Sequence, residues 1–275
     1  AMLSYGHRWG DFSWDSSFTF SANKNEIVEL VKDYVHPETG KTYNVDKLEL
    51  KTDEGRGFGK AKFILKEGGT LGDLYTHADL KRDINGNILI DDSGNVTAID
   101  NAGDIKLGSV LPKANLAWNN SFSYKGINAG FLLTARLGGI VYSATQAYLD
   151  LYGVSETSAA ARDAGGVWVN GRSRVNPQSF YEVVASQSGL PTYYTYSATN
   201  LRLQEAHIGY TIPRRWLGNV CDINVSLVGR NLWMIYCKAP FDPEAVATTN
   251  NYYQGIDYFM MPSTRNIGFN IKINF

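Results

Sequence analysis

The side chains that could carry out chemistry are few in this sequence and form no recognised catalytic pattern. Asp242 and Glu244 flank Pro243, which is a turn signature before it is an acid–base pair. The sequence has no Gly-x-Ser-x-Gly motif, no phosphate-binding loop and no dinucleotide fingerprint. We therefore predict that the chain is not an enzyme and uses no cofactor. The histidines are scattered without metal-ligand spacing: His7, His36, His77 and His207.

Cys221 and Cys237 are the only cysteines. We expect Cys221 early in a strand and Cys237 beyond the end of that strand. The chain between them, if extended, would span roughly 50 Å at about 3.3 Å per residue, which is far beyond disulfide reach. We predict that both thiols are unpaired.

The stretch from Asp83 to Asp92 is acidic and rich in Asn and Gly. An EF-hand loop requires Asp-x-Asp-x-Asp-Gly with a terminal Glu. Here Gly86 comes two positions early and no terminal Glu follows. An Asn-Gly hairpin turn is favoured over a calcium site, although the residues leave the choice open.

The candidate binding groups are aromatic rings in a long connection and two arginines on polar strand faces. The rings could stack on sugars or pack within the loop. The arginines, expected at similar heights, could pair with an acidic residue of a plug domain or bind solute. The candidate substrate-binding residues are Trp168, Tyr193, Tyr194, Tyr196, Arg136 and Arg230.

The composition favours a β-protein with rings at an interface. The 275 residues include 17 Tyr, 6 Trp and 27 Gly, and the hydrophobic fraction is 44%. The net charge of −1 argues against a nucleic-acid partner. No stretch reaches the roughly 18 apolar residues that a membrane helix needs.

The elements that must position these side chains are strands in which apolar and polar residues alternate with a period of two. In the last strand, the odd positions from Ile267 to Phe275 are apolar, whereas even positions such as Asn270 and Lys272 are polar. A shift of parity between Leu203 and Ile208 indicates either a β-bulge near Gln204–His207 or two apolar residues that point inward. The predicted strands are Leu3–Trp9, Phe12–Leu30, Leu116–Tyr124, Ile127–Leu137, Leu201–Ile212, Val220–Leu232 and Thr264–Phe275.

The connections between these strands are alternately short and long. Gly10-Asp11, Lys125-Gly126 and Pro213–Asn219 are short, whereas the other three connections span tens of residues. We expect a hairpin around Phe63 in the first long connection and a helix, Ala144–Ala164, in the second.

Strands of about 10 residues with this asymmetry are typical of an outer-membrane β-barrel, with short periplasmic turns and long extracellular loops. The last strand would then end at the periplasm. A soluble β-sandwich that binds carbohydrate is the alternative, because its strands also alternate. The expected fold class is all-β: about seven antiparallel strands of a transmembrane barrel, with long loops that carry a short helix.

The sequence resembles the SusC/RagA-type TonB-dependent transporters of Bacteroidetes outer membranes. The resemblance rests on short motifs that follow the family's order along nearly the whole chain. They are Asp11–Trp14, Asn23–Leu30, Gly72–Tyr75, Asn119–Gly126, Ala147–Asp150, Leu201–Glu205, Gly209–Pro213, Val228–Leu232 and the terminal Phe275.

The resemblance implies that residues 1–275 are the C-terminal part of a barrel of about 22 strands, expected here without the plug domain and the first strands. It implies nutrient import driven by TonB, a SusD-like lipoprotein partner, a glycan or peptide substrate, and a bilayer location in the bacterial outer membrane. Phe275 would be the signal for barrel assembly. A surface-binding or adhesion barrel is the alternative of a different class. Open strand edges in lipid would leave backbone groups unsatisfied, so we expect the remaining barrel and plug to pair with this segment.

Overall fold

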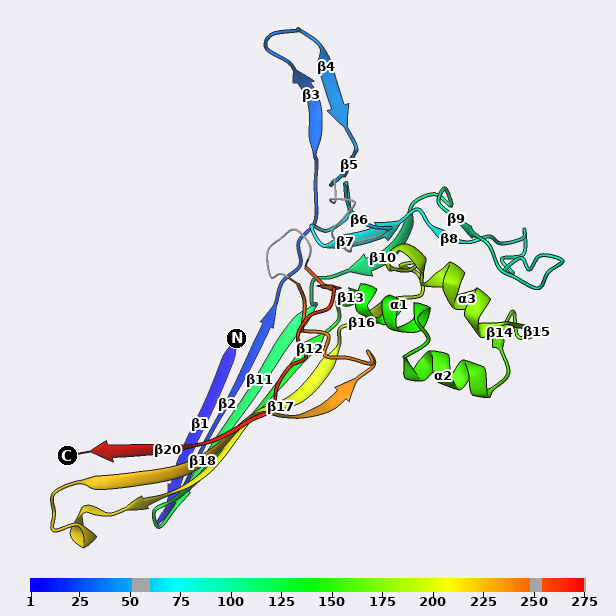
Figure 1. The fold of residues 1–275 in the computed structure, drawn as a ribbon. Coiled ribbons are helices and arrows are strands. Elements are labelled where there is room, and N and C mark those ends of the chain that lie inside the picture. The colour runs from blue at the N-terminus through cyan, green and yellow to red at the C-terminus, as the bar shows by residue number, and fades with distance from the viewer. Residues whose placement is uncertain (51–59, 248–253, 275) are drawn as a thin grey trace.

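The computed structural model describes residues 1–50, 60–247 and 254–274. Its main element is a sheet of seven antiparallel strands, here called the wall, in which each strand pairs with the next wall strand along the chain (Figure 1). The expected up-and-down meander is therefore confirmed, and the sandwich alternative is wrong because the wall is a single sheet. The wall strands are β1 Met2–Trp9, β2 Phe12–Ala22, β11 Ala114–Tyr124, β12 Ile127–Leu137, β17 Asn200–Ile212, β18 Asp222–Cys237 and β20 Asn266–Asn274.

The three short connections all lie at one end of the wall, as predicted (Figure 1). We call this end the turn end. Lys125 and Gly126, with φ of 47° and 89°, form the left-handed two-residue turn that hairpin strands favour. The third turn contains the short 3-10 helix η2, Arg214–Trp216. The opposite end, here called the loop end, carries the three long connections.

The three long connections fold together into one subdomain, here called the cap. Its hydrophobic core joins Phe63 and Leu74 of the first connection, Tyr142 and Val184 of the second, and Ile256 of the third. Parallel pairing of β13 with β19 also links the second connection to the third. The cap is therefore a folded unit and not a set of separate loops.

The first connection supplies the strands of a four-stranded sheet and two small hairpins. Phe63 lies in β6, which pairs with β7, so the predicted hairpin is confirmed. The hairpin β3–β4 projects away from the rest of the cap (Figure 1). The elements are β3 Val31–Val35, β4 Thr42–Val45, β5 Lys47–Glu49, β6 Ala61–Lys66, β7 Asp73–Thr76, β8 Asp79–Leu80, β9 Ala98–Ile99 and β10 Ile105–Ser109.

The second connection carries three helices, whereas the sequence indicated one. A left-handed Gly153 ends α1, with Val154 N–H bonded to Leu149 C=O. The predicted stop at Gly165-Gly166 is found, because Gly166 N–H bonds to Ala161 C=O at the end of α2. The elements are β13 Ile140–Ser143, α1 Ala144–Leu151, α2 Glu156–Asp163, β14 Val167–Val169, β15 Ser173–Val175, α3 Pro177–Val184, η1 Ser186–Ser188 and β16 Thr195–Ser197. The third connection contains β19 Ile256–Asp257.

Two strand ends differ from the prediction by five residues or more, and several strand starts differ by one or two residues. β2 stops at Ala22 because its partner β11 begins at the opposing Ala114, so residues 23–30 lie beyond the wall. β18 continues to Cys237, which is therefore the last residue of the strand and not beyond its end. Cys221 directly precedes β18, which begins at Asp222, and therefore does not lie within the strand as predicted. Cys221 and Cys237 are both free thiols.

The β-bulge is confirmed. Leu203 and Glu205 of β17 face adjacent residues of β12, Leu133 and Leu132, so Gln204 is the extra residue. One extra residue reverses the side-chain parity. Leu201 and Ile208, although odd and even, therefore both lie on the apolar face.

Candidate functional site

The wall has one apolar and one polar face, and the strand register shows that neighbouring strands agree. Phe122 opposes Trp14 and Phe269 opposes Leu227 on the apolar face, whereas Asn119 opposes Ser17 on the polar face. Hydroxyl and amide side chains predominate on the polar face of the first central strands. They are Ser13, Ser17, Thr19, Ser21, Asn115, Asn119, Ser121, Ser123, Asn128 and Thr134.

Aromatic rings gather on the apolar face near the turn end. Trp9 lies 5.9 Å from Phe12, and Phe12 lies 6.5 Å from Phe122, between ring centroids. Tyr210 and Trp216 form a similar pair at 6.4 Å near the third turn. Rings with polar tips concentrate where a membrane meets water.

Arg136, near the loop end of β12, holds the first long connection. Its Nη2 donates to the backbone oxygen of Val110 at 2.8 Å. Gly139 packs close to this guanidinium, because a Cβ added there would lie 3.3 Å from Nη2. In the described structure Arg136 therefore links β12 of the wall to the first long connection of the cap. A role in solute binding stays a prediction.

Arg230 does not lie at the height of Arg136, so that expectation is wrong. Arg230 opposes Glu205, which opposes Leu132, whereas Arg136 opposes Asn200 further toward the loop end. Its Nε donates to Glu205 Oε2 at 3.0 Å, and its side chain is 68% exposed. An acidic partner is thus found on the neighbouring strand, and contact with solute stays a prediction.

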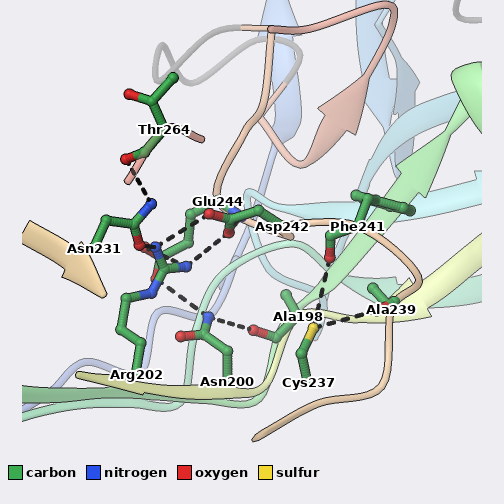
Figure 2. Close-up of polar contacts among 10 residues, drawn as sticks. All are labelled: Ala198, Asn200, Arg202, Asn231, Cys237, Ala239, Phe241, Asp242, Glu244 and Thr264. Atoms are coloured by element: carbon green, nitrogen blue, oxygen red, sulfur yellow. Dashed lines mark hydrogen bonds and ion pairs between the residues drawn. The ribbon is translucent and has the colours of Figure 1, made fainter. Parts of the chain in front are cut away.

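The most buried charge cluster centres on Arg202, which the sequence prediction did not select (Figure 2). The Arg202 side chain is only 6% exposed, and its Nη2 lies 2.7 Å from Asp242 Oδ1 and 3.2 Å from Glu244 Oε2. Nη1 adds a second contact to Asp242 at 3.1 Å, so the pairing is bidentate. The only sequence signal for this role was the place of Arg202 on the polar face near a strand end.

The two acidic residues also form the turn that the sequence indicated. Glu244 N–H donates to Asp242 Oδ1 at 3.0 Å, and Asn200 Nδ2 donates to Glu244 Oε1 at 3.2 Å. Burial raises the pKa of the Asp242 carboxyl, but hydrogen bonds, chiefly from Arg202, outweigh it and leave the pKa below its usual 3.8. Asp242 is thus ionised, and carboxylates hold both terminal nitrogens of Arg202, whereas the buried Nε of Arg202 has no hydrogen-bond partner among the described residues. Figure 2 shows that this cluster joins the third long connection to β17.

Asn231 of β18 adds a further contact to the cluster of Arg202, Asp242 and Glu244, here called the anchor. It lies at a point where the backbone of the strand is irregular. Its φ of 52° is left-handed, and its Nδ2 donates to the backbone oxygen of Thr264 at 3.2 Å (Figure 2). Thr264 lies just before β20. The cluster therefore holds both the start and the end of the third connection against the wall.

The candidate aromatic residues divide between the cap surface and its core. Trp168 is 56% exposed and lies under Arg174, whose guanidinium is 4.5 Å from the ring centroid. Tyr194 is 2% exposed and donates to Asp150 Oδ2 at 3.0 Å. Burial and then Asp150 raise the pKa of the Tyr194 hydroxyl, so it stays a neutral donor.

Tyr193 and Tyr196 are half-buried. The Tyr193 ring packs edge-on against Phe180 of the cap core, with centroids 6.2 Å apart. The Tyr196 ring packs in the same way against Phe241 at 5.5 Å, and burial with Asp150 raises the pKa of Tyr196 to about 12. Contact with substrate stays a prediction for all four aromatic residues.

The acidic stretch forms two successive Asx turns. Asp83 Oδ1 accepts N–H groups from Asn85 and Asn87, and Asp91 Oδ1 accepts those from Ser93 and Asn95. These hydrogen bonds, the largest from Asn87, lower the pKa of the exposed Asp83 carboxyl. Within residues 1–50, 60–247 and 254–274 no group of three His, Cys, Asp or Glu side chains could hold a metal ion.

In the part of the chain that the structure describes, no helix is long and apolar enough to cross a membrane. Phe275, the candidate assembly signal, lies outside the described residues, so its role stays a prediction.

The chain is similar to curated TonB-dependent receptors of Formosa agariphila. It is 25% identical to TonB-dependent receptor P3 over an alignment of 289 positions, which covers 95% of this chain and 27% of that protein. It is 25% identical to receptor P26 over 98% of this chain and 28% of that protein. The chain thus spans little more than a quarter of the length of these relatives. No protein-family model matches.

Two solved structures share the fold. A structure of the RagAB peptide importer in a closed-closed state aligns with a TM-score of 0.64 and 16% identity, over 100% of this chain and 29% of that chain. A second structure, of the RagAB peptide transporter, gives 0.62 and 16% over 100% and 28%. At this identity the structural match supports the fold alone.

Proposed function

Because the chain has the fold and sequence character of part of a SusC/RagA-type TonB-dependent transporter, we propose that it forms the C-terminal barrel wall and extracellular cap of an outer-membrane nutrient importer. The observation that carries this proposal is the two-sided asymmetry of the wall. One face is apolar and the other polar, and every long connection lies at one end. A wall of this kind separates lipid from a polar lumen and exposes its loops on one side of the membrane.

The two outer strands of the wall also support the proposal that the wall is part of a larger barrel. β1 and β20 pair on one side only within the described chain, and a free strand edge in lipid leaves N–H and C=O groups unsatisfied at several kcal/mol each. We infer that further strands of the same transporter pair with them. The proposed orientation has the turn end in the periplasm and the cap outside.

The proposed activity is import of oligomeric nutrients, glycans or peptides, with energy from TonB and with a SusD-like lipoprotein above the cap. The sequence relatives named TonB-dependent receptors support the dependence on TonB, and the similarity to the RagAB structures supports a lipoprotein partner. An enzyme activity is not proposed, because the matched proteins are receptors and transporters.

Uptake by cells that carry the full-length protein tests this function. We expect the protein in detergent-extracted outer membranes, with heat-modifiable gel migration, and we expect uptake of fluorescent peptide or oligosaccharide digests to stop when TonB is depleted. Surface binding that persists without TonB and without any uptake would instead support the adhesion alternative.

A further inference from the structure

A groove lies at the loop end of the wall, on its polar side. It consists of two cavities of about 360 and 390 Å³ that share lining residues. Asn23, Asn25, Leu111 and Pro112 line both cavities. We call these two cavities the rim groove.

The groove presents amide and hydroxyl groups that the chain itself does not use. Asn115 and Ser21 are register partners on the polar face, and both line the first cavity. Within the described residues the side chains of Ser21, Asn23 and Asn115 make no hydrogen bond. Asn25 uses only its Oδ1, which accepts from Leu71 N–H at 3.2 Å, so its NH₂ group remains available.

The backbone along the groove is also unpaired. β2 ends at Ala22, opposite Ala114, and the next backbone hydrogen bond is from Ile27 N–H to Gly69 C=O at 2.9 Å. In the described part of the chain, residues 23–26 therefore have no ladder partner, although they run on from β2 toward β3 (Figure 1). Such a segment can accept an added strand, which is how many proteins bind extended peptides.

The remaining lining decides which ligand fits. Leu71, Val110, Leu111 and Pro112 form an apolar side, whereas none of the described residues that line the two cavities is aromatic. The described lining thus offers no ring on which a sugar could stack. No carboxylate is among the described lining residues, and the two lysines, Lys24 and Lys113, line only the second cavity. Lys24 lies 3.2 Å from Glu26 in an ion pair, and the first cavity has no charged residue in its described lining. Side-chain amides carry both a donor and an acceptor, which match a peptide group.

We propose that the rim groove binds an extended, uncharged stretch of peptide main chain. The peptide lies along residues 23–26 as an added strand, with the amides of Asn23 and Asn115 on its peptide groups and the apolar side against its side chains. This inference rests on the proposed function, since it assigns a substrate class to the importer. Selection is by main chain, so peptides of different sequence are accepted.

The test uses the full-length transporter, purified in detergent, and two fluorescein-labelled probes. One probe is an end-blocked decapeptide of Ala, Ser and Gly, and the other is maltohexaose. The double variant Asn23→Ala/Asn115→Ala removes two amides from the groove. We expect it to weaken peptide binding about tenfold or more, because each hydrogen bond contributes about 1 kcal/mol and about 1.4 kcal/mol is tenfold.

Asn119→Ala is the matched control. Asn119 lies on the same strand and the same face, opposite Ser17, but lines neither cavity. We expect peptide affinity within about twofold of wild type for this variant, since no groove contact is lost. Equal losses in both variants would overturn the assignment, because they would show a general effect of the polar face.

A photo-crosslinking residue at Leu71, an exposed member of the apolar side, tests occupancy directly. Cross-linking to the decapeptide that unlabelled peptide suppresses supports the proposal. An internal cross-link that peptide does not suppress overturns it, because another segment of the transporter would then fill the groove. Maltohexaose binding that is lost in the double variant, with no peptide binding, overturns the peptide assignment.

The outcomes separate this inference from the proposed function. If uptake depends on TonB but Asn23→Ala/Asn115→Ala binds peptide as tightly as wild type, the proposed importer function stands and the rim groove is not the peptide site. If uptake by cells with the wild-type protein does not depend on TonB, the proposed importer function is wrong.

Discussion

The wall and the cap bury their apolar side chains in different ways. The hydrophobic core of the described structure runs from Ala61 to Ile256 and lies wholly in the three long connections. The wall supplies none of its members, and Phe269 of β20 is 79% exposed. The cap is therefore stabilised by its own core, whereas the wall, in the proposed barrel, would be stabilised by lipid and by further strands. A perturbation should consequently affect one region without the other.

The largest expected effect is on the cap core. Phe63→Ala removes a ring that is only 2% exposed, and such a truncation costs about 3–5 kcal/mol. Hydrogen exchange followed by mass spectrometry should show faster exchange throughout the cap, with the heat-modifiable migration of the barrel unchanged. Collapse of both regions together would refute their independence.

The next largest effect is expected when the ion pairs of Arg202, which join the cap to the wall, are removed. Arg202→Ala leaves Asp242 buried without its partner, which costs about 3 kcal/mol. Exchange should increase in residues 238–247 and remain slow in β6 and β7. Arg230→Ala is the control, because its pair with Glu205 is more exposed and such pairs contribute about 0–1 kcal/mol.

A charge on each face of β20 tests which face meets lipid. Phe269→Arg should destabilise the folded full-length barrel by about 2–4 kcal/mol, as an arginine in the hydrocarbon region does. The neighbouring Asn270→Arg should have little effect, because Asn270 is on the polar face opposite Ser226. Urea titration in lipid vesicles measures both, and equal effects would contradict the assignment of faces.

A smaller effect is expected at the junction of the second and third connections. Ser143 caps α1 through Gln146 N–H at 3.0 Å and donates to Asp257 Oδ2 at 2.6 Å. Ser143→Ala should destabilise α1 locally by about 1–2 kcal/mol. Exchange of the first turn of α1 should rise, whereas α3 should be unaffected.

The smallest effect concerns pH. The pKa of Asp242 is lowered in the folded protein, so the stability that it contributes is present above the ordinary value of 3.8 and is lost as the pH falls through the lower folded value. Exchange of residues 238–247, corrected for intrinsic rates, should therefore be constant from pH 8 to about 5 and rise only below about 4. A rise in exchange of residues 238–247 near pH 6 would show that a titrating group other than Asp242 controls this segment.

The sequence by itself determined the wall. Period-two alternation identified its strands and their faces, since side chains of a strand alternate regardless of what it pairs with. The pattern of short and long connections gave the strand directions. The parity shift even indicated the bulge at Gln204, although only pairing with β12 excluded the inward-pointing alternative. For the acidic stretch the sequence favoured an Asn-Gly turn and left a calcium site open, whereas the structure showed the two Asx turns.

Only the tertiary structure decided what the long connections do. Arg202 meets Asp242 and Glu244 through a chain reversal that no local pattern encodes, and Tyr194 is buried because three separate connections share one core. The extent of β2 likewise depended on where β11 begins. These outcomes depend on contacts between residues far apart in the chain, whereas the faces of the wall depend on neighbours two residues away.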